Sequence, residues 1–128
     1  PQGRVVVNEF LRLPRFPELF AIGDNARAIN PITGAAVPTA AQFALQQGYL
    51  TADNLRAVIA GRAPKLYRPR VLGEVVSLGK HLAIGWASLP LGTRLNFVGF
   101  LGSLLKRAIS EKHLLLLWRE RQNWSGHW

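Results

Sequence analysis

The residues of this chain that are best placed for chemistry stand where an expected strand ends and an expected helix begins. The apolar run from Leu19 to Ile22 meets Gly23, which places the Asp24 carboxylate just beyond the strand. A helical segment then opens at Pro38. In α/β proteins, backbone N–H groups at such strand ends and helix starts hold nucleotide cofactors. The pattern therefore favours a cofactor site shared by the two segments.

The helical segment has polar side chains at its beginning and along one face. Thr39 and Gln42 have the spacing of a capping box, and apolar residues then recur with helical periodicity as far as Gly61. Gln42 and Gln46 are four residues apart and share a face. Gln47 points about 100° away and is expected to be structural. The simplest alternative is a well-capped helix with a solvated polar face.

Two sequence patterns resemble those of a known enzyme family. The first, apolar-apolar-Ala-Ile-Gly-Asp-x-Ala over residues 19–26, is similar to the second FAD-binding motif of the pyridine nucleotide-disulfide oxidoreductase-like flavoproteins. The second, Ala-Gln-x-Ala-x-Gln-Gln over residues 41–47, narrows the resemblance to the single-subunit type II NADH:quinone oxidoreductases. The resemblance covers most of the 128 residues and matches the C-terminal part of such an enzyme.

The resemblance implies site residues for a flavin and a quinone. In the family, residues like Gly23 and Asp24 hold FAD, and the carboxylate accepts a hydrogen bond from a ribityl hydroxyl. A Gly-Asp pair by itself more often caps a turn. The helix start at Ala41 and Gln42 would face the pyrimidine edge of the flavin. Gln42 and Gln46 would border the quinone pocket, NADH would be the electron donor, and no catalytic residue is assigned.

The remaining parts of such an enzyme do not occur in these 128 residues. The family needs two G-x-G-x-x-G loops, one for FAD and one for NADH, and the chain has neither. It also begins with Pro1 rather than Met. We therefore interpret it as a fragment of an NADH dehydrogenase and expect the fragment alone to be inactive. Because Cys is absent and His81, His113 and His127 lack metal-ligand spacing, neither a disulfide nor a metal site is expected.

Charge divides the chain into two expected domains: the C-terminal part of an FAD-binding domain at 1–61, and a basic, apolar region at 62–128. The first contains five Arg and four acidic residues. The second contains eleven Lys or Arg against three acidic residues, hence +8, together with all four Trp. A strongly basic half predicts a partner of negative charge, either anionic lipid or nucleic acid.

The basic region is expected to contain a hairpin followed by helices. Two short β runs, at 71–77 and 81–86, are separated by a turn that contains Gly. After a break at Leu89–Gly92, an apolar stretch is expected to be helical from Thr93 onwards, with a hinge at Ser110–Glu111.

This expected helix is too short to cross a bilayer. Eleven uncharged residues separate Arg94 from Lys106, whereas a spanning helix needs about 20. A wide apolar face bordered by cations is typical of a helix that lies in the membrane interface, although an ordinary core helix is the alternative. The resembled enzymes attach in this peripheral, monotopic way, here to the cytoplasmic face. The residues expected to contact the membrane are Leu95, Phe97, Phe100, Leu101, Leu104, Lys106, Arg107 and Trp118.

The expected fold is α+β, with the C-terminal remnant of an FAD-binding α/β domain, a long helix, a β hairpin and C-terminal amphipathic helices. Exposed strand edges in such a fragment would favour a homo-oligomer or swapped elements. The competing hypothesis is a small basic nucleic-acid-binding module, which the sequence pI of about 11.4 suggests. The basic residues are interleaved with Leu and Phe, and no nucleic-acid signature occurs, so lipid is the favoured partner.

Overall fold

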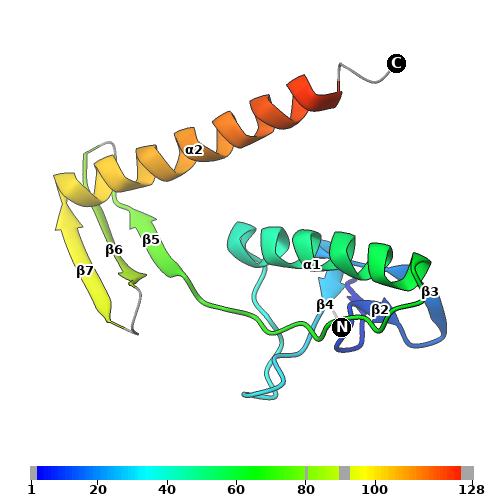
Figure 1. Cartoon of the computed structure of the whole chain (residues 1–128). Helices are drawn as coiled ribbons and strands as arrows, with labels where there is room; N and C mark the ends of the chain where they lie inside the picture. Colours follow the sequence, from blue (N-terminus) through cyan, green and yellow to red (C-terminus); the bar gives the residue numbers. More distant parts are fainter. Residues whose placement is uncertain (1–2, 80, 90–92, 125–128) are drawn as a thin grey trace. The chain divides into compact units, whose positions relative to one another are not determined.

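The chain forms two compact units, Pro1–Val71 and Leu72–Trp128. The computed structural model describes residues 3–79, 81–89 and 93–124, and Figure 1 draws the chain from end to end. Helices and antiparallel sheets occur together, which confirms the α+β class. Each unit is described by itself.

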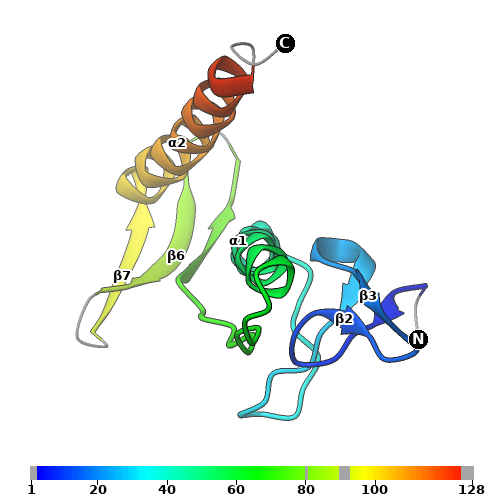
Figure 2. The same ribbon diagram turned by 45° about the vertical axis from the view of Figure 1, so that its right-hand side comes forward.

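The first unit consists of short strand pairs and one long helix. Its elements are β1 (Val5–Val6), β2 (Arg12–Leu13), β3 (Phe16–Phe20), the 3₁₀ turn η1 (Gly23–Asn25), β4 (Ala26–Arg27) and α1 (Ala41–Ile59). Strand β1 pairs with β4 in parallel, and β2 pairs with β3 in antiparallel orientation. Figure 2 views α1 nearly end-on, with β2 and β3 grouped on one side of it.

The strand before Asp24 differs from the expected one. A buried strand at Leu19–Ile22 was expected, but β3 ends at Phe20, and Leu19 is half exposed. The reason is that β3 pairs only with the two-residue strand β2, so one narrow ribbon replaces a central strand. Ala21 and Ile22 still pack against the core of the unit, so the chain reaches Gly23 from a partly buried segment.

A tight turn before β2 holds Leu11 in an unusual conformation. Leu11 is fully buried, and its backbone has a φ of 65°, in the left-handed region that residues other than Gly seldom adopt. The Asn8 side chain supports the turn, because its Oδ1 accepts hydrogen bonds from the N–H groups of Phe10 and Arg12, each at 3.0 Å. The buried side chain and the Asn8 bridge therefore fix this backbone geometry together.

Helix α1 begins later than the sequence pattern indicated. The expected capping box at Thr39 and Gln42 was wrong, since the N-cap position is taken by Ala40, whose side chain cannot accept a hydrogen bond. The C-terminal end is as expected: Gly61 has a φ of 66° and donates to Val58 O at 3.0 Å, and the next residue, Arg62, donates to Ala57 O at 2.7 Å. These two bonds form a Schellman motif, in which Gly accommodates the left-handed backbone.

The segment that follows α1 returns along the first unit and is tied to it by polar contacts. Asn54, with no exposed surface, donates to Lys65 O at 2.9 Å and accepts from Lys65 N at 2.7 Å. The Tyr67 N–H donates to Glu9 O at 2.7 Å, so the N-terminal segment is held as well. The apolar core of the unit consists of Val7, Leu11, Ala26, Ala28, Val37, Phe43 and Tyr67.

The second unit is a three-stranded antiparallel sheet followed by a long helix. Its elements are β5 (Gly73–Ser77), β6 (Ala83–Ser88), β7 (Arg94–Gly99) and α2 (Phe100–Trp124), and the strand order is β5-β6-β7. The hairpin expected at 71–77 and 81–86 is confirmed by β5 and β6. The expected break at Leu89–Gly92 lies mostly outside the described residues.

Two expectations for this unit were wrong. Helix was expected from Thr93, but residues 94–99 form β7, which pairs with β6 along its whole length. Leu95 and Phe97 therefore lie on a strand. No hinge interrupts α2 at Ser110–Glu111: the helix is continuous there, and the Ser110 hydroxyl donates to Lys106 O at 3.1 Å. The pairing of β7 with β6 explains the first error.

Helix α2 is packed closely on the sheet near its first turn and extends beyond the sheet towards its C-terminal end (Figures 1 and 2). Gly102 is buried, and a Cβ atom there would lie 2.6 Å from Ala83 O and 3.1 Å from the Phe97 ring. Only Gly permits this approach of helix to strand. Further along, the side chains of Leu114, Leu115, Leu117 and Trp118 are about half exposed or more.

Candidate functional site

The turn that contains Asp24 is held against α1 by its glycine. Gly23 has a φ of 64°, and its N–H donates to Gln47 Oε1 at 2.6 Å. A Cβ atom at Gly23 would contact the Ala44 Cβ at 3.5 Å, so the turn sits directly on the first half of the helix. The positive φ favours Gly because other side chains would clash with the backbone. The turn is thus fixed in place by backbone geometry and one side-chain bond.

The predicted flavin residues lie on this turn and at the start of α1. Asp24 is exposed within η1, so its carboxylate is accessible to a ligand hydroxyl. Ala41 begins α1 and Gln42 follows it, so both lie at the positive end of the helix dipole. The Phe43 and Ala44 N–H groups both turn back to Ala40 O. An exposed acceptor and a helix N-terminus are therefore both present, which fits the polar groups of a flavin.

Gln47, which the sequence indicated to be structural, is buried and holds the turn that contains Asp24. Its side chain is 3% exposed, and it bonds at both ends: Oε1 accepts from Gly23, and Nε2 donates to the Tyr67 hydroxyl at 3.3 Å. Burial raises the pKa of Tyr67, and the hydrogen bond from Gln47 opposes that rise in part. The spacing of Gln47 from Phe43 indicates that both lie on one face of the helix. The buried residues of α1, all on this face, are Phe43, Gln47, Thr51 and Asn54.

Gln46 contacts the main chain in this structure. Its Nε2 donates to Arg70 O at 2.8 Å, and its Oε1 accepts from Arg70 N at 2.9 Å, so both ends of the amide are engaged. Gln42, one turn earlier, is partly buried. The structure brings the two glutamines onto one face of α1, as the spacing indicated. Their role towards a quinone stays a prediction.

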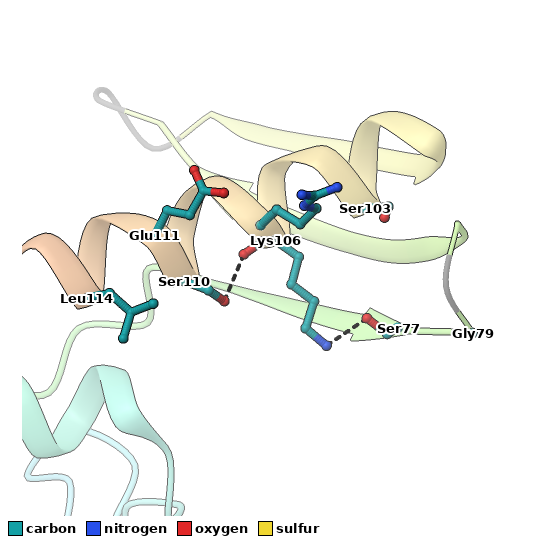
Figure 3. Close-up of a pocket in the computed structure, with 8 residues that line it drawn as sticks. Ser77, Gly79, Ser103, Lys106, Ser110, Glu111 and Leu114 are labelled. Carbon is teal, nitrogen blue, oxygen red and sulfur yellow. Dashed lines mark hydrogen bonds between the residues drawn. The ribbon is translucent and has the colours of Figure 1, made fainter.

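In the second unit, the cations expected at a membrane border an open hollow. The hollow has a volume of about 360 Å³ between β5 and α2 (Figure 3). Lys106 reaches across it, and its Nζ donates to Ser77 Oγ at 2.6 Å. Arg107 and Glu111 also line the hollow. Phe100, Leu104 and Trp118 are more than half exposed, whereas Phe97 is partly buried and the Leu101 side chain lies outside the described part of the chain.

The described residues contain neither a membrane-spanning helix nor a cluster of metal ligands. Neither helix within residues 3–79, 81–89 and 93–124 is long and apolar enough to cross a membrane. Over the same part of the chain, no group of three or more His, Asp or Glu side chains is placed to hold a metal ion. His127 lies outside the described residues, as does the side chain of His113.

Comparison with known proteins identifies curated relatives of this chain. The type II NADH:quinone oxidoreductase of Staphylococcus aureus (strain NCTC 8325 / PS 47) is 32% identical over 84 residues, which are 66% of this chain and 21% of the relative. The type II NADH:quinone oxidoreductase of Staphylococcus saprophyticus is 33% identical over 84 residues, which are again 66% of this chain and 21% of the relative. No protein-family profile matches the chain. The chain thus spans about a fifth of the curated relatives it matches, and the resemblance inferred from its motifs is confirmed.

Proposed function

We propose, since this chain is related to type II NADH:quinone oxidoreductases, that it is the C-terminal part of an FAD-dependent enzyme of this kind and is inactive alone. The observation that carries the proposal is the Gly23–Asp24 turn, fixed on α1 beside the start of the helix. Bound FAD would accept a hydride from NADH and pass electrons to a quinone.

Gly23, Asp24 and the first turn of α1 would hold the flavin. The exposed Asp24 carboxylate is a charged acceptor for a ribityl hydroxyl, and a charge-assisted hydrogen bond is stronger than a neutral one. Backbone N–H groups at Ala41 and Gln42 would face the pyrimidine edge. There the positive end of the helix dipole would stabilise negative charge. Small side chains at Ala40 and Ala41 leave room for a close approach.

Gln42 and Gln46 would bind the quinone from the same helix face. An amide N–H is a suitable donor to a quinone carbonyl, which needs a positioned hydrogen bond rather than a strong acid. Because Gln46 holds Arg70 at 2.8 and 2.9 Å, it would exchange or share these bonds when a quinone binds. Gln42→Ala or Gln46→Ala should raise the KM for quinone and leave flavin reduction by NADH near the wild-type rate. Equal slowing of both half-reactions in stopped-flow would exclude this role.

The flavin role is tested by Asp24→Ala in the full-length protein. Loss of the charged acceptor should weaken FAD binding by about 1.5–3 kcal/mol, measured by reconstituting apoprotein with FAD. Asp53→Ala is the matched control, because Asp53 is an exposed carboxylate on α1 that pairs with Lys65 at 3.4 Å. If Asp24→Ala retains wild-type FAD affinity, Asp24 does not hold the ribityl chain.

The second unit would attach the enzyme to the cytoplasmic face of the membrane as a peripheral protein. The exposed apolar side chains of α2 would enter the interface, and neighbouring cations would bind anionic lipid. Phe97 is left out of this surface because its ring packs near Gly102. The proposed contact residues are Phe100, Leu104, Leu114, Leu115, Leu117, Trp118, Lys106, Arg107, Lys112 and Arg119.

Vesicle co-sedimentation tests this attachment. The full-length protein should bind anionic vesicles, bind less at high salt, and lose binding in Leu115→Asp. Ile59→Asp is the control, since Ile59 is 85% exposed but lies on α1 in the first unit. The competing nucleic-acid hypothesis predicts duplex DNA binding that falls steeply with salt and does not respond to Leu115→Asp. Wild-type protein that stays in the supernatant at low salt would exclude membrane attachment.

Self-association is expected for the 128-residue fragment. In size-exclusion chromatography, an elution volume that depends on protein concentration would reveal it.

A further inference from the structure

Gln47 connects three segments of the first unit through one buried amide. Its Oε1 accepts from Gly23 N at 2.6 Å, and its Nε2 donates to Tyr67 Oη at 3.3 Å. Tyr67 is itself 3% exposed, and its N–H donates to Glu9 O at 2.7 Å. A chain of hydrogen bonds therefore runs from the Asp24 turn through α1 to the segment after the helix, and from there to the N-terminal segment.

Packing alone does not account for an amide at this position. A leucine fills a similar volume, and a buried amide is costly unless its polar atoms are bonded. Asn54, the other fully buried amide of α1, uses both ends on the single residue Lys65. Gln47 instead uses one end for the turn and the other for Tyr67. The Gly23 N–H can only donate, so the amide oxygen must face the turn, and the second bond holds the amide nitrogen at Tyr67.

We propose that Gln47 is a positioning residue for the flavin, a role that rests on the function proposed above. By holding the Gly23 N–H, it fixes the backbone of η1 at the residue before Asp24, and so sets where the carboxylate can meet a ribityl hydroxyl. Tyr67 assists by holding the nitrogen end of the amide. Gln47 itself does not contact the cofactor, because its carbonyl oxygen and amide nitrogen are both occupied inside the unit.

The test compares Gln47→Leu with Gln47→Glu in the full-length protein. The leucine removes the acceptor, and FAD should bind about five- to tenfold more weakly. The carboxylate of the glutamate keeps an acceptor for Gly23 and can accept a hydrogen bond from the Tyr67 hydroxyl, so FAD affinity should return to within about twofold of wild type. A buried carboxylate nevertheless lowers thermal stability. Gln47→Leu should therefore be the more stable of the two variants, and Gln47→Glu should bind FAD more tightly.

Two further variants keep the proposal falsifiable. Asn54→Ala is the matched control, and it should lower stability without changing FAD affinity. Tyr67→Phe removes only the hydroxyl and serves if Gln47→Leu does not fold; it should weaken FAD binding by about two- to fivefold. Hydrogen exchange of a peptide that contains Gly23 supplies a readout that needs no flavin. Exchange at Gly23 should speed up in Gln47→Leu by more than the loss of stability of the unit explains, whereas in Asn54→Ala it should speed up only in proportion to that loss.

The outcomes separate this inference from the proposed function. If the wild type binds FAD, and Gln47→Leu and Tyr67→Phe bind it equally well, Gln47 does not position the flavin. If FAD affinity follows thermal stability across all four variants, the role of Gln47 is only structural and the inference fails. If the wild type binds no FAD, the proposed function fails. Faster exchange at Gly23 in Gln47→Leu would still support the claim that Gln47 positions the turn. Unchanged exchange at Gly23 would overturn that claim.

Discussion

Replacing Asn54 by Ala should loosen the contact between α1 and Lys65, in the segment that follows the helix. The side chain has no exposed surface and forms two hydrogen bonds with the main chain of Lys65, at 2.9 and 2.7 Å. These bonds join residues that are eleven positions apart in the sequence. The alanine removes both bonds at once and leaves a small void beside the helix.

The size of the effect follows from these two bonds. A hydrogen bond inside a protein contributes about 0.5–1.5 kcal/mol net, so the pair contributes about 1–3 kcal/mol. The larger penalty for an unsatisfied buried group does not apply, because Lys65 is an exposed residue and water can reach its main chain in the variant. A loss of this size corresponds to amide exchange that is roughly five- to a hundredfold faster wherever the unit must open for exchange to occur.

The assay is hydrogen exchange of the α1 backbone amides, followed by NMR or mass spectrometry. Asp53→Ala is the control, since Asp53 is adjacent and its carboxylate reaches Arg56 at 4.0 Å and Lys65 at 3.4 Å. Exposed ion pairs contribute little, so this variant should exchange at nearly the wild-type rate. The reasoning is refuted if Asn54→Ala exchanges as slowly as wild type, or if Asp53→Ala exchanges equally fast.

Two more predictions concern Tyr67 and Gly102. Burial raises the pKa of Tyr67 above the usual value of about 10, so the unfolded chain ionises first, and the first unit should lose stability as the pH rises above about 10. Tyr67→Phe should remove this part of the dependence, and urea midpoints at pH 9 and 11 would measure it. Gly102→Ala places a Cβ 2.6 Å from Ala83 O and should destabilise the second unit by about 1–3 kcal/mol. Denaturant unfolding followed by tryptophan fluorescence measures this loss of stability, with Ser110→Ala as the control. An unchanged unfolding midpoint in Gly102→Ala would contradict the prediction.

Local patterns predicted α1 and its end more reliably than its beginning. Apolar periodicity identified the helix, and Gly61 identified its termination, because both signals lie within the helix and its next few residues. The N-terminal signal at Thr39 failed because a capping side chain acts only if the backbone enters the helix at that residue. The helix instead starts after Ala40.

Long-range pairing explains the larger error in the second unit. A short, mostly apolar segment such as Leu95–Val98 is compatible with either a strand or a helix, and periodicity over four residues does not separate the two. The deciding contribution is the edge of β6, whose residues pair with all of β7 at separations that grow from Ser88–Arg94 to Ala83–Gly99. Gly99, with a φ of 90°, then ends the strand, and the helix begins immediately after it.

The candidate site was predictable in its exposed part and not in its buried part. Asp24 stood out because its motif is contiguous in the sequence. The partners of Gln47 are 24 and 20 residues away, and no local signal connects a glutamine to Gly23 or Tyr67. Gln46 was expected either at a ligand or on a solvated face, yet in this structure its amide holds Arg70. Contacts across the fold, rather than composition or spacing, decide what each glutamine does.

The left-handed backbone at Leu11 limits which amino acids this position can accept in any related sequence. Glycine would relieve the strain of a φ of 65° but would empty a site that is fully buried. Valine or isoleucine would keep an apolar side chain but tolerate the backbone still less than leucine does. Selection for folding in a saturation library should therefore retain very few residues here, with leucine favoured. The left-handed backbone favours glycine and the buried site favours a large apolar side chain, so few substitutions at position 11 should be neutral.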